Sequence, residues 1–186
     1  QFEASSSKFI EAGYEPIGLD HFSLPDDDMS EALNEGTLHR NFQGYTADSA
    51  PTLIGFGASA IGQMHQGYMQ NVSPLKQYSE RITAGNFAIE RGIELSQDDR
   101  LRGYVIERIM CDLSVDLNFV CRKFDVPNTT FISEIEKLKP LSEDRIINLS
   151  DNIITVTEIG RPFVRLVAAA FDAYLDNGKG RHSRAV

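Results

Sequence analysis

Cysteine and tryptophan are the scarcest residue types in this sequence. Only Cys111 and Cys121 are present among 186 residues, and tryptophan is absent. Two cysteines cannot hold together a disulfide-stapled scaffold, and their scarcity favours a reducing, cytoplasmic compartment. The longest apolar run, residues 166–171, is far shorter than the roughly 18 residues of a membrane span, so we expect no membrane-spanning segment. The sequence also lacks the charged and apolar regions of a secretory signal.

Basic residues are outnumbered by acidic ones. The chain has 18 Lys and Arg against 27 Asp and Glu, which gives a net charge of −9. Non-specific nucleic-acid binding needs a basic face, so nucleic acid is not an expected partner. Hydrophobic residues make up 41% and charged residues 24% of the chain. This composition is typical of a globular protein and argues against disorder.

The few basic residues are unevenly distributed. Residues 1–90 contain four of them against twelve acids, a net charge of −8, whereas residues 91–186 carry a net charge of −1. The first half is rich in glycine and short apolar runs, and the second half is helix-like. These shifts predict a boundary near Gly92, between a domain at residues 1–91 and another at residues 92–186. Because the chain begins at Gln1, inside a predicted helix, we expect it to be part of a longer protein.

Helical and extended segments alternate through the first half. Apolar spacing, caps and glycine stops predict helices at 2–12, 29–34 and 75–84, a strand at 14–19, and a buried strand or tight turn at 53–61. Phe2, Phe9 and Ile10 are expected on one face of the first helix. The alternation indicates the last part of an α/β domain.

The second half is mainly helical. Residues 96–99, Ser-Gln-Asp-Asp, form a capping-box-like start for a helix whose apolar residues recur at helical spacing. Two shorter helices are expected at 115–124 and 130–139. β-branched runs around residues 150–152 predict a hairpin, and Thr157 begins a last helix. Helices followed by a β-wing and another helix predict a winged-helix-like C-terminal domain.

A glycine-rich segment is the first candidate binding site. Residues 55–60, Gly-Phe-Gly-Ala-Ser-Ala, match the dinucleotide fingerprint G-x-G-x-x-A, but Gly62 and Gly67 would break the helix that must follow it. We therefore reject dinucleotide binding. Two interpretations stay open: the glycines let a ligand approach the backbone closely, or they pack a strand of small residues against helices.

The second candidate site is the polar and aromatic segment from His39 to Tyr45. It contains Arg40, and arginine suits bidentate carboxylate binding, so the segment suits an anionic organic ligand. A solvated loop is the alternative. Asp20 and His21 follow a predicted strand, and they are either an acid–base pair or structural residues.

The remaining histidines and the cysteines do not predict a metal site. His65 and His182 have no acidic or cysteine partner at ligand spacing. Cys111 and Cys121 lie ten residues apart and match no metal motif. We expect both cysteines to be core residues on helix faces.

Three longer strings point to a known family. They are residues 14–27, with Gly-Leu-Asp-His-Phe at 18–22, residues 38–46, with His-Arg-Asn-Phe-Gln-Gly-Tyr-Thr at 39–46, and residues 55–61. Together and in this order, they resemble the oxygen-independent coproporphyrinogen III oxidases, which are radical S-adenosylmethionine (SAM) enzymes of haem biosynthesis. The resemblance extends over nearly the whole chain.

This resemblance implies a fold and a reaction. The family has an incomplete parallel (β/α) barrel, whose last part corresponds to residues 1–91, followed by a helical C-terminal domain. Its [4Fe–4S] cluster, held by a C-x3-C-x2-C motif, cleaves SAM to a 5′-deoxyadenosyl radical. The radical abstracts hydrogen from the propionates of coproporphyrinogen III, and two carboxyl groups leave as CO2 to give protoporphyrinogen IX. This chain lacks the cluster motif, so we expect the ligands in the missing N-terminal part and no activity from this fragment alone.

The resemblance also implies residue roles, although it identifies no catalytic residue here. The isoleucine after Gly-x-Gly-x-Ser-Ala contacts SAM in the family and corresponds to Ile61. The predicted cofactor site also includes Gly55, Gly57, Ser59 and Ala60. The predicted substrate site consists of Arg40, Asn41, Gln43 and Tyr45, which match family positions near the active-site cavity. Apolar walls that exclude water from the radical are expected from Phe42, Tyr45, Phe56 and Ile61.

Two alternative functions stay open at this stage. One is a family paralogue that handles haem or another tetrapyrrole as a chaperone. The other is a non-enzymatic interaction module built on the C-terminal domain. Haem titration and a gel shift at low salt, respectively, test these alternatives.

Overall fold

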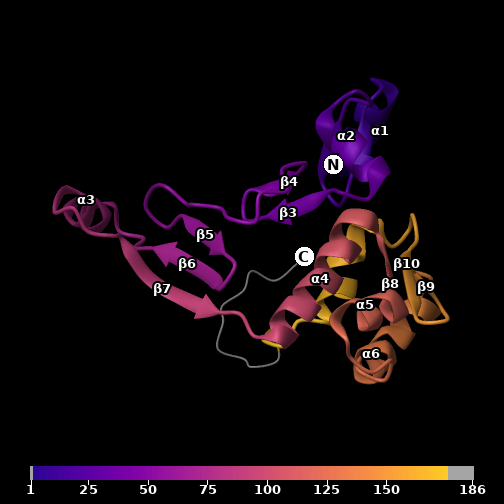
Figure 1. Cartoon of the computed structure of the whole chain (residues 1–186). Helices are drawn as coiled ribbons and strands as arrows, with labels where there is room; N and C mark the ends of the chain where they lie inside the picture. The colour runs from indigo at the N-terminus through magenta and orange to yellow at the C-terminus, as the bar shows by residue number, and fades with distance from the viewer. Residues whose placement is uncertain (1, 176–186) are drawn as a thin grey trace. The chain divides into compact units, whose positions relative to one another are not determined.

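The computed structural model describes residues 2–175, and the side chains from residue 4 onward (Figure 1). Phe2, expected on a helix face, and His182 therefore lie outside the described side chains. The chain divides into two compact units, which we call unit 1 (residues 1–47 and 101–186) and unit 2 (residues 48–100). Gly92, at the predicted boundary, lies inside a strand of unit 2, so these units do not coincide with the predicted domains. The domains 1–91 and 92–186 stay a prediction about the longer protein.

The first segment of unit 1 consists of two helices and two short hairpins. Its elements are α1 (Phe2–Glu11), β1 (Glu15–Ile17), β2 (His21–Ser23), α2 (Asp28–Glu35), β3 (His39–Asn41) and β4 (Gly44–Thr46). Both helices were expected, and α2 is capped by the Asp27 carboxylate and ended by Gly36 in the left-handed conformation.

The strand predicted at residues 14–19 needs correction, and the segment from His39 to Tyr45, for which a solvated loop was the alternative to a binding site, forms a hairpin. β1 turns back at residues 18–20 and pairs antiparallel with β2, so His21 belongs to a strand of its own. β3 pairs antiparallel with β4. These strands have three residues each, which is too short for an alternating pattern to be recognised in the sequence.

The second segment of unit 1 is helical with a small sheet. Its elements are α4 (Gln97–Asp112), whose first turn belongs to unit 2, β8 (Ser114–Asp116), α5 (Leu117–Phe124), α6 (Ile132–Glu143), β9 (Ile147–Ser150), β10 (Ile153–Val156), η1 (Arg161–Phe163) and α7 (Val164–Ala169). The expected capping box forms, because the Ser96 hydroxyl and the Asp99 carboxylate bond each other's backbone N–H. The expected hairpin also forms, with Asp151 and Asn152 both at positive φ, as a tight two-residue turn requires.

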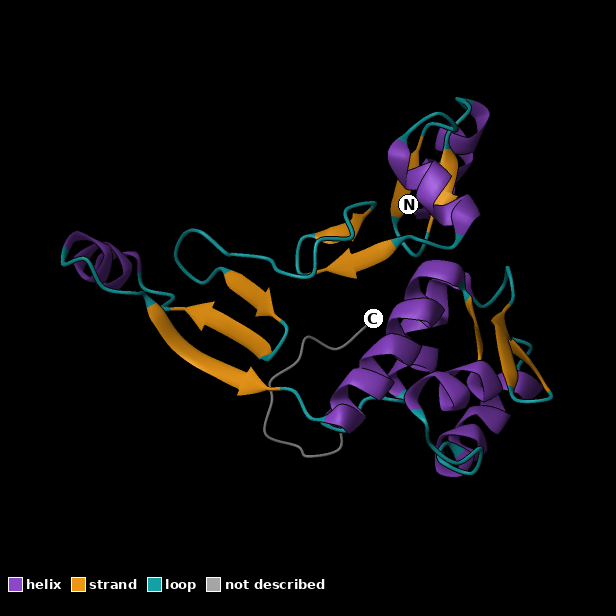
Figure 2. Ribbon diagram, viewed as in Figure 1, coloured by secondary structure: helices purple, strands orange, loops and turns teal. Residues whose placement is uncertain are grey.

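The core of unit 1 lies between this sheet and the helices on one side of it (Figure 2). The strand order is β8-β10-β9, and all pairs are antiparallel. Cys121 is buried in this core, and Cys111 belongs to a second cluster with Ile17, Leu38 and Tyr45. Both cysteines are thus buried helix residues, as expected.

Unit 2 is a three-stranded antiparallel sheet with one helix. Its elements are β5 (Ile61–Met64), β6 (Gly67–Asn71), α3 (Leu75–Thr83) and β7 (Ile89–Glu94), and α3 follows at the end of the sheet where β6 finishes and β7 begins (Figure 1). Of the two alternatives predicted at 53–61, the buried strand is wrong, and a tight turn occurs only at residues 57–60, where the Ala60 N–H donates to the Gly57 carbonyl. Most of this segment is irregular, and Ile54 and Phe56 are 61% and 87% exposed.

The strand pairs within the described residues are all antiparallel. The alternation of helices and strands in the first half therefore reflects hairpins between helices, and not a parallel sheet within this chain. None of the helices in the described part has the length and apolar character that crossing a bilayer would require.

Candidate functional site

Arg40, Asn41, Gln43 and Tyr45, the predicted substrate residues, all lie on the β3–β4 hairpin of unit 1. Arg40 and Tyr45 are directly opposite each other across the two strands, and the Arg40 guanidinium carbon lies 5.4 Å from the centre of the Tyr45 ring. Arg40 is exposed, whereas Tyr45 is only 7% exposed. The hairpin thus presents a cation on top of a buried aromatic ring.

Asn41 and Gln43 shape the turn of this hairpin. The Asn41 Oδ1 accepts a hydrogen bond from the Gln43 N–H at 2.7 Å. Asparagine favours such turns because its side chain imitates a backbone carbonyl. The Gln43 side chain is exposed, as is Phe42 at 51%.

The Tyr45 hydroxyl is bound on both sides by backbone groups of unit 1. It donates to the Met110 carbonyl at 3.0 Å and accepts from the Leu19 N–H at 3.1 Å. Burial raises the pKa of Tyr45 above its ordinary value. Gly18 leaves room for the ring, because a Cβ at this position would overlap the Tyr45 side chain. Tyr45 therefore joins the first two hairpins to α4.

Helix α4 also holds β3 through charged side chains. The Glu107 Oε1 lies 3.1 Å from the His39 Nδ1 and 3.3 Å from the Arg40 backbone nitrogen. Arg108 donates to the Leu38 carbonyl at 2.6 Å and to the Asp112 carboxylate at 2.8 Å. These bonds hold the backbone at Leu38 and at Arg40, so the position of this end of β3 depends on a helix about 70 residues further along the chain.

Cys111 and Asp112, at the end of α4, are shielded from water, Cys111 completely and Asp112 in part. Burial raises the pKa of Asp112, although Arg108 opposes the shift, and burial raises the pKa of Cys111 to about 12. A thiol with so high a pKa is a poor ligand or nucleophile at neutral pH.

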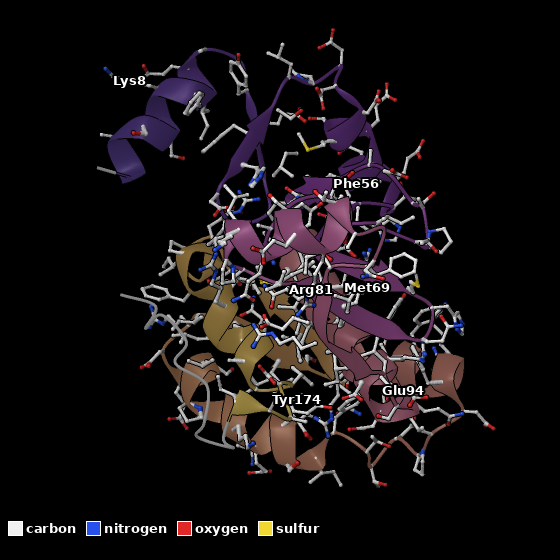
Figure 3. The ribbon with its side chains drawn as sticks, turned by 90° about the vertical axis from the view of Figure 1, so that its left-hand side faces the viewer. Lys8, Phe56, Met69, Arg81, Glu94 and Tyr174 are labelled. Carbon is white, nitrogen blue, oxygen red and sulfur yellow. The ribbon has the colours of Figure 1, made fainter. Side chains whose placement is uncertain are left out.

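An apolar cavity of about 690 Å³ lies in unit 2. It is bounded by the irregular segment after Leu53, one face of the sheet and α3. Its wall includes Phe56 and Met69, both labelled in Figure 3, together with Ile54, Ile82 and Phe87. The volume and the apolar wall are typical of a small-molecule site.

The predicted cofactor residues divide with respect to this cavity. Gly55 and Ala60 line it, whereas Gly57, Ser59 and Ile61 are not part of its wall. Strand alternation explains the position of Ile61, because Gly62 and Met64 on the same strand face the cavity. Ile61 therefore lies on the opposite face of the sheet.

The structure requires glycine at positions 55 and 57 for different reasons. A Cβ on Gly55 would come within 2.9 Å of the Ile61 backbone, so Gly55 permits a close approach between two backbone segments. Gly57 has φ +104°, with open space where a Cβ would stand. Asn71 holds this segment by donating to the carbonyls of both glycines, at 3.0 and 2.9 Å.

The described residues fit the two cofactors of the resembled family unequally. The apolar cavity beside Gly55 and Ala60 suits the flat face of the adenine ring of SAM, which packs against apolar and aromatic side chains. Among residues 2–175, no group of three or more potential metal-binding side chains occurs. The two cysteines are buried and their pKa values are raised, so they do not fit an iron–sulfur cluster.

Some site residues were not found from the sequence. Glu107 and Arg108 are ordinary helix residues by pattern, and only the fold brings them to β3. Asn71 shows no motif either. By contrast, the Asn-Phe-Gln-Gly string at 41–44 carried a recognisable turn composition.

Comparisons with known proteins agree with the resemblance found in the motifs. Searched protein-family models give no match. An oxygen-independent coproporphyrinogen III oxidase from Bradyrhizobium diazoefficiens is 49% identical over 183 residues, which cover 98% of this chain and 41% of the relative. The enzyme of the same name from Salmonella typhimurium is 41% identical over 166 residues, covering 89% of this chain and 36% of the relative.

A solved structure gives the same result for the fold. Coproporphyrinogen III oxidase (HemN) from Escherichia coli, described as a radical SAM enzyme, matches with a TM-score of 0.87 and 36% identity. The match covers 93% of this chain and 40% of that chain. This chain thus spans about two fifths of the length of the relatives that it matches.

Proposed function

We propose that this chain, a homologue of the C-terminal part of the oxygen-independent coproporphyrinogen III oxidases, carries the substrate-binding part of such an enzyme. The complete protein would convert coproporphyrinogen III to protoporphyrinogen IX by oxidative decarboxylation in the cytoplasm. The observation that carries this proposal is the 49% identity over 98% of the chain. The N-terminal part of the same protein would be the partner of this chain and would hold the [4Fe–4S] cluster, and this chain alone would be inactive.

The β3–β4 hairpin is the proposed substrate site. Coproporphyrinogen III carries four propionate side chains. Arg40 offers an exposed guanidinium, and Glu107 and Arg108 hold the backbone at Arg40 and Leu38. Asn41 and Gln43 hold the turn beside it. Tyr45 supports Arg40 through its ring, since its hydroxyl is bound to the protein backbone. A charged hydrogen bond to one propionate would orient the macrocycle.

Gly55, Gly57, Ser59, Ala60 and Ile61 are the proposed cofactor residues. When bound, SAM together with the reduced cluster supplies the radical that removes hydrogen from a propionate. Gly55 and Ala60 would pack against its adenine ring from the cavity wall. Gly57 and Ser59 would keep this segment in shape. Ile61 lies on the other face of the sheet, so a SAM molecule in the cavity would not touch it, and Ile61 would act by packing β5 behind the cavity wall.

We propose two finer assignments of fold. The order α4-β8-α5-α6-β9-β10, with the sheet order β8-β10-β9, supports a winged-helix-like module in residues 92–186. Residues 1–91 would complete the end of a (β/α) barrel whose parallel strands come from the preceding part of the protein.

The proposal is tested with the full-length protein, reconstituted with iron and sulfide under anaerobic conditions. We expect coproporphyrinogen III to be converted, and Arg40→Leu to weaken its binding by about 10- to 100-fold, since charged hydrogen bonds contribute about 1.5–3 kcal/mol. SAM affinity should be unchanged. Arg165→Leu, at another exposed arginine in α7, is the matched control and should bind substrate normally.

Two results would contradict the proposal. If the full-length protein binds haem tightly but neither cleaves SAM nor converts coproporphyrinogen III, it is a tetrapyrrole-handling paralogue. If Arg40→Leu lowers SAM affinity and leaves substrate affinity intact, the hairpin is not the substrate site.

A further inference from the structure

We infer that the imidazole of His21 binds a substrate carboxylate beside Arg40. The inference rests on the proposed function and adds a second anion-binding group to the proposed substrate site. No residue match with the family assigns this role to His21. The carrying observation is that His21 and Arg40, from different hairpins, both pack against the ring of Tyr45.

The geometry places the imidazole of His21 and the guanidinium of Arg40 against the same ring. The imidazole ring stands nearly perpendicular to the Tyr45 ring, at 79°, with 5.0 Å between the ring centres. The Arg40 guanidinium carbon lies 5.4 Å from the centre of the same ring. The two groups are therefore separated by no more than the sum of these distances. Two propionates of one macrocycle can reach groups spaced in this way.

The neighbours of His21 leave one ring nitrogen available. The Asp20 Oδ1 lies 2.9 Å from Nδ1, and this contact orients the ring. Among the described residues, Nε2 has no hydrogen-bond partner. It lies 3.0 Å from the place where Gly44 would carry a Cβ, so the missing side chain at Gly44 keeps Nε2 accessible. His21 itself is 38% exposed.

The distribution of charge singles out this place for an anion. Lys8 and Arg40 are the only Lys or Arg in residues 1–47, which contain nine acidic residues. His39 is paired with Glu107, so its Nδ1 is already bound. The groups that face His21 are Asp20 in the preceding turn and Tyr45 on β4, and its partner on β1 is the apolar Ile17. An incoming carboxylate would accept a hydrogen bond from Nε2 while Nδ1 faces Asp20.

The test uses the full-length protein and two fluorescent probes, coproporphyrin III and its tetramethyl ester. The ester keeps the macrocycle but has no carboxylate. We expect His21→Gln to weaken coproporphyrin III binding about tenfold and to leave ester binding unchanged. His65→Gln makes the same change in the exposed β5–β6 turn and should affect neither probe. His21→Phe keeps an aromatic ring against Tyr45, so it gives the answer if His21→Gln is unstable.

Proton uptake on ligand binding distinguishes an anion-binding role of His21 from a packing role, because a packing role would not change it. Calorimetric titration of coproporphyrin III in two buffers of different ionisation enthalpy measures the protons bound per ligand. The wild-type protein should take up more protons than His21→Gln. The inference would be overturned if both His21 variants bound coproporphyrin III as tightly as the wild-type protein does and took up the same number of protons per ligand. If Arg40→Leu still loses affinity in that case, the proposed function survives. If the wild-type protein binds the acid and the ester equally, the proposed substrate site fails as well.

Discussion

Replacing Tyr45 with phenylalanine separates a structural role of its hydroxyl from a substrate-binding role. The hydroxyl bonds the Met110 carbonyl at 3.0 Å and the Leu19 N–H at 3.1 Å, and the residue is 7% exposed. Tyr45→Phe keeps the ring that supports Arg40 and His21. It removes both hydrogen bonds and leaves the Met110 carbonyl and the Leu19 N–H without the Tyr45 hydroxyl as a partner.

The expected loss of stability follows from these two bonds. Each hydrogen bond contributes about 1 kcal/mol net, and an unpaired buried partner costs about 1–3 kcal/mol, so we expect a loss of about 2–4 kcal/mol. Substrate binding should change less than threefold, because Phe presents a similar face to the guanidinium. Urea denaturation gives the free energy of unfolding, and coproporphyrin III titration gives the affinity.

The opposite pattern would refute this reasoning. A hydroxyl that binds substrate directly would lower affinity tenfold or more in Tyr45→Phe and leave the denaturation midpoint unchanged. Comparison with Tyr14→Phe controls for the loss of a hydroxyl in general, since Tyr14 lies before β1 and contacts Phe9 through its ring.

Two further predictions concern the scaffold around the site. Although burial alone raises the pKa of Glu134, hydrogen bonds from Arg102 at 2.8 Å and from Ser133 lower it below its ordinary value of 4.5. The Arg102–Glu134 pair therefore stabilises the fold fully above about pH 4.5, and this contribution is lost as the pH falls through the folded-state pKa of Glu134. Glu134→Gln should lower the free energy of unfolding by about 3 kcal/mol in urea denaturation at pH 7. The difference between this variant and the wild type should shrink below pH 4.5. Gly18→Ala should lower the melting temperature far more than Gly36→Ala. Both positions have positive φ, at +54° and +69°, but only a Cβ on Gly18 would overlap the Tyr45 side chain. Equal losses in the two variants would show that Tyr45 moves aside freely.

Local signals predicted most helices and the β9–β10 hairpin well. The last helix, predicted to begin at Thr157, is wrong at its start: a turn and the 3-10 helix η1 come first, and α7 begins at Val164. The Ser96 capping box, the Gly36 stop and the Asp151-Asn152 turn each depend on residues within four positions of one another. Such chemistry is present in the sequence itself. The first two hairpins were missed because three-residue strands show no period, and their turns were interpreted as a strand end and a loop.

The candidate site was predicted only as a set of residues. The motif strings placed Arg40 and Tyr45 in one segment, and the hairpin brings them face to face. Ile61 and Gly55 were grouped by sequence, but strand alternation puts Ile61 on the face away from the cavity. No local pattern shows that Glu107 reaches β3, because the contact depends on how α4 packs in unit 1.

The anchoring of β3 makes the proposed substrate site depend on the second segment of unit 1. Here the strand that carries Arg40 is bound on one side by Glu107 and Arg108 and on the other by the Met110 carbonyl through Tyr45. All three anchors lie on one turn of α4. The position of the proposed carboxylate-binding arginine therefore depends on this helix, and a chain that ended before α4 would keep the His-Arg-Asn-Phe-Gln-Gly-Tyr-Thr motif without the geometry that makes it a site.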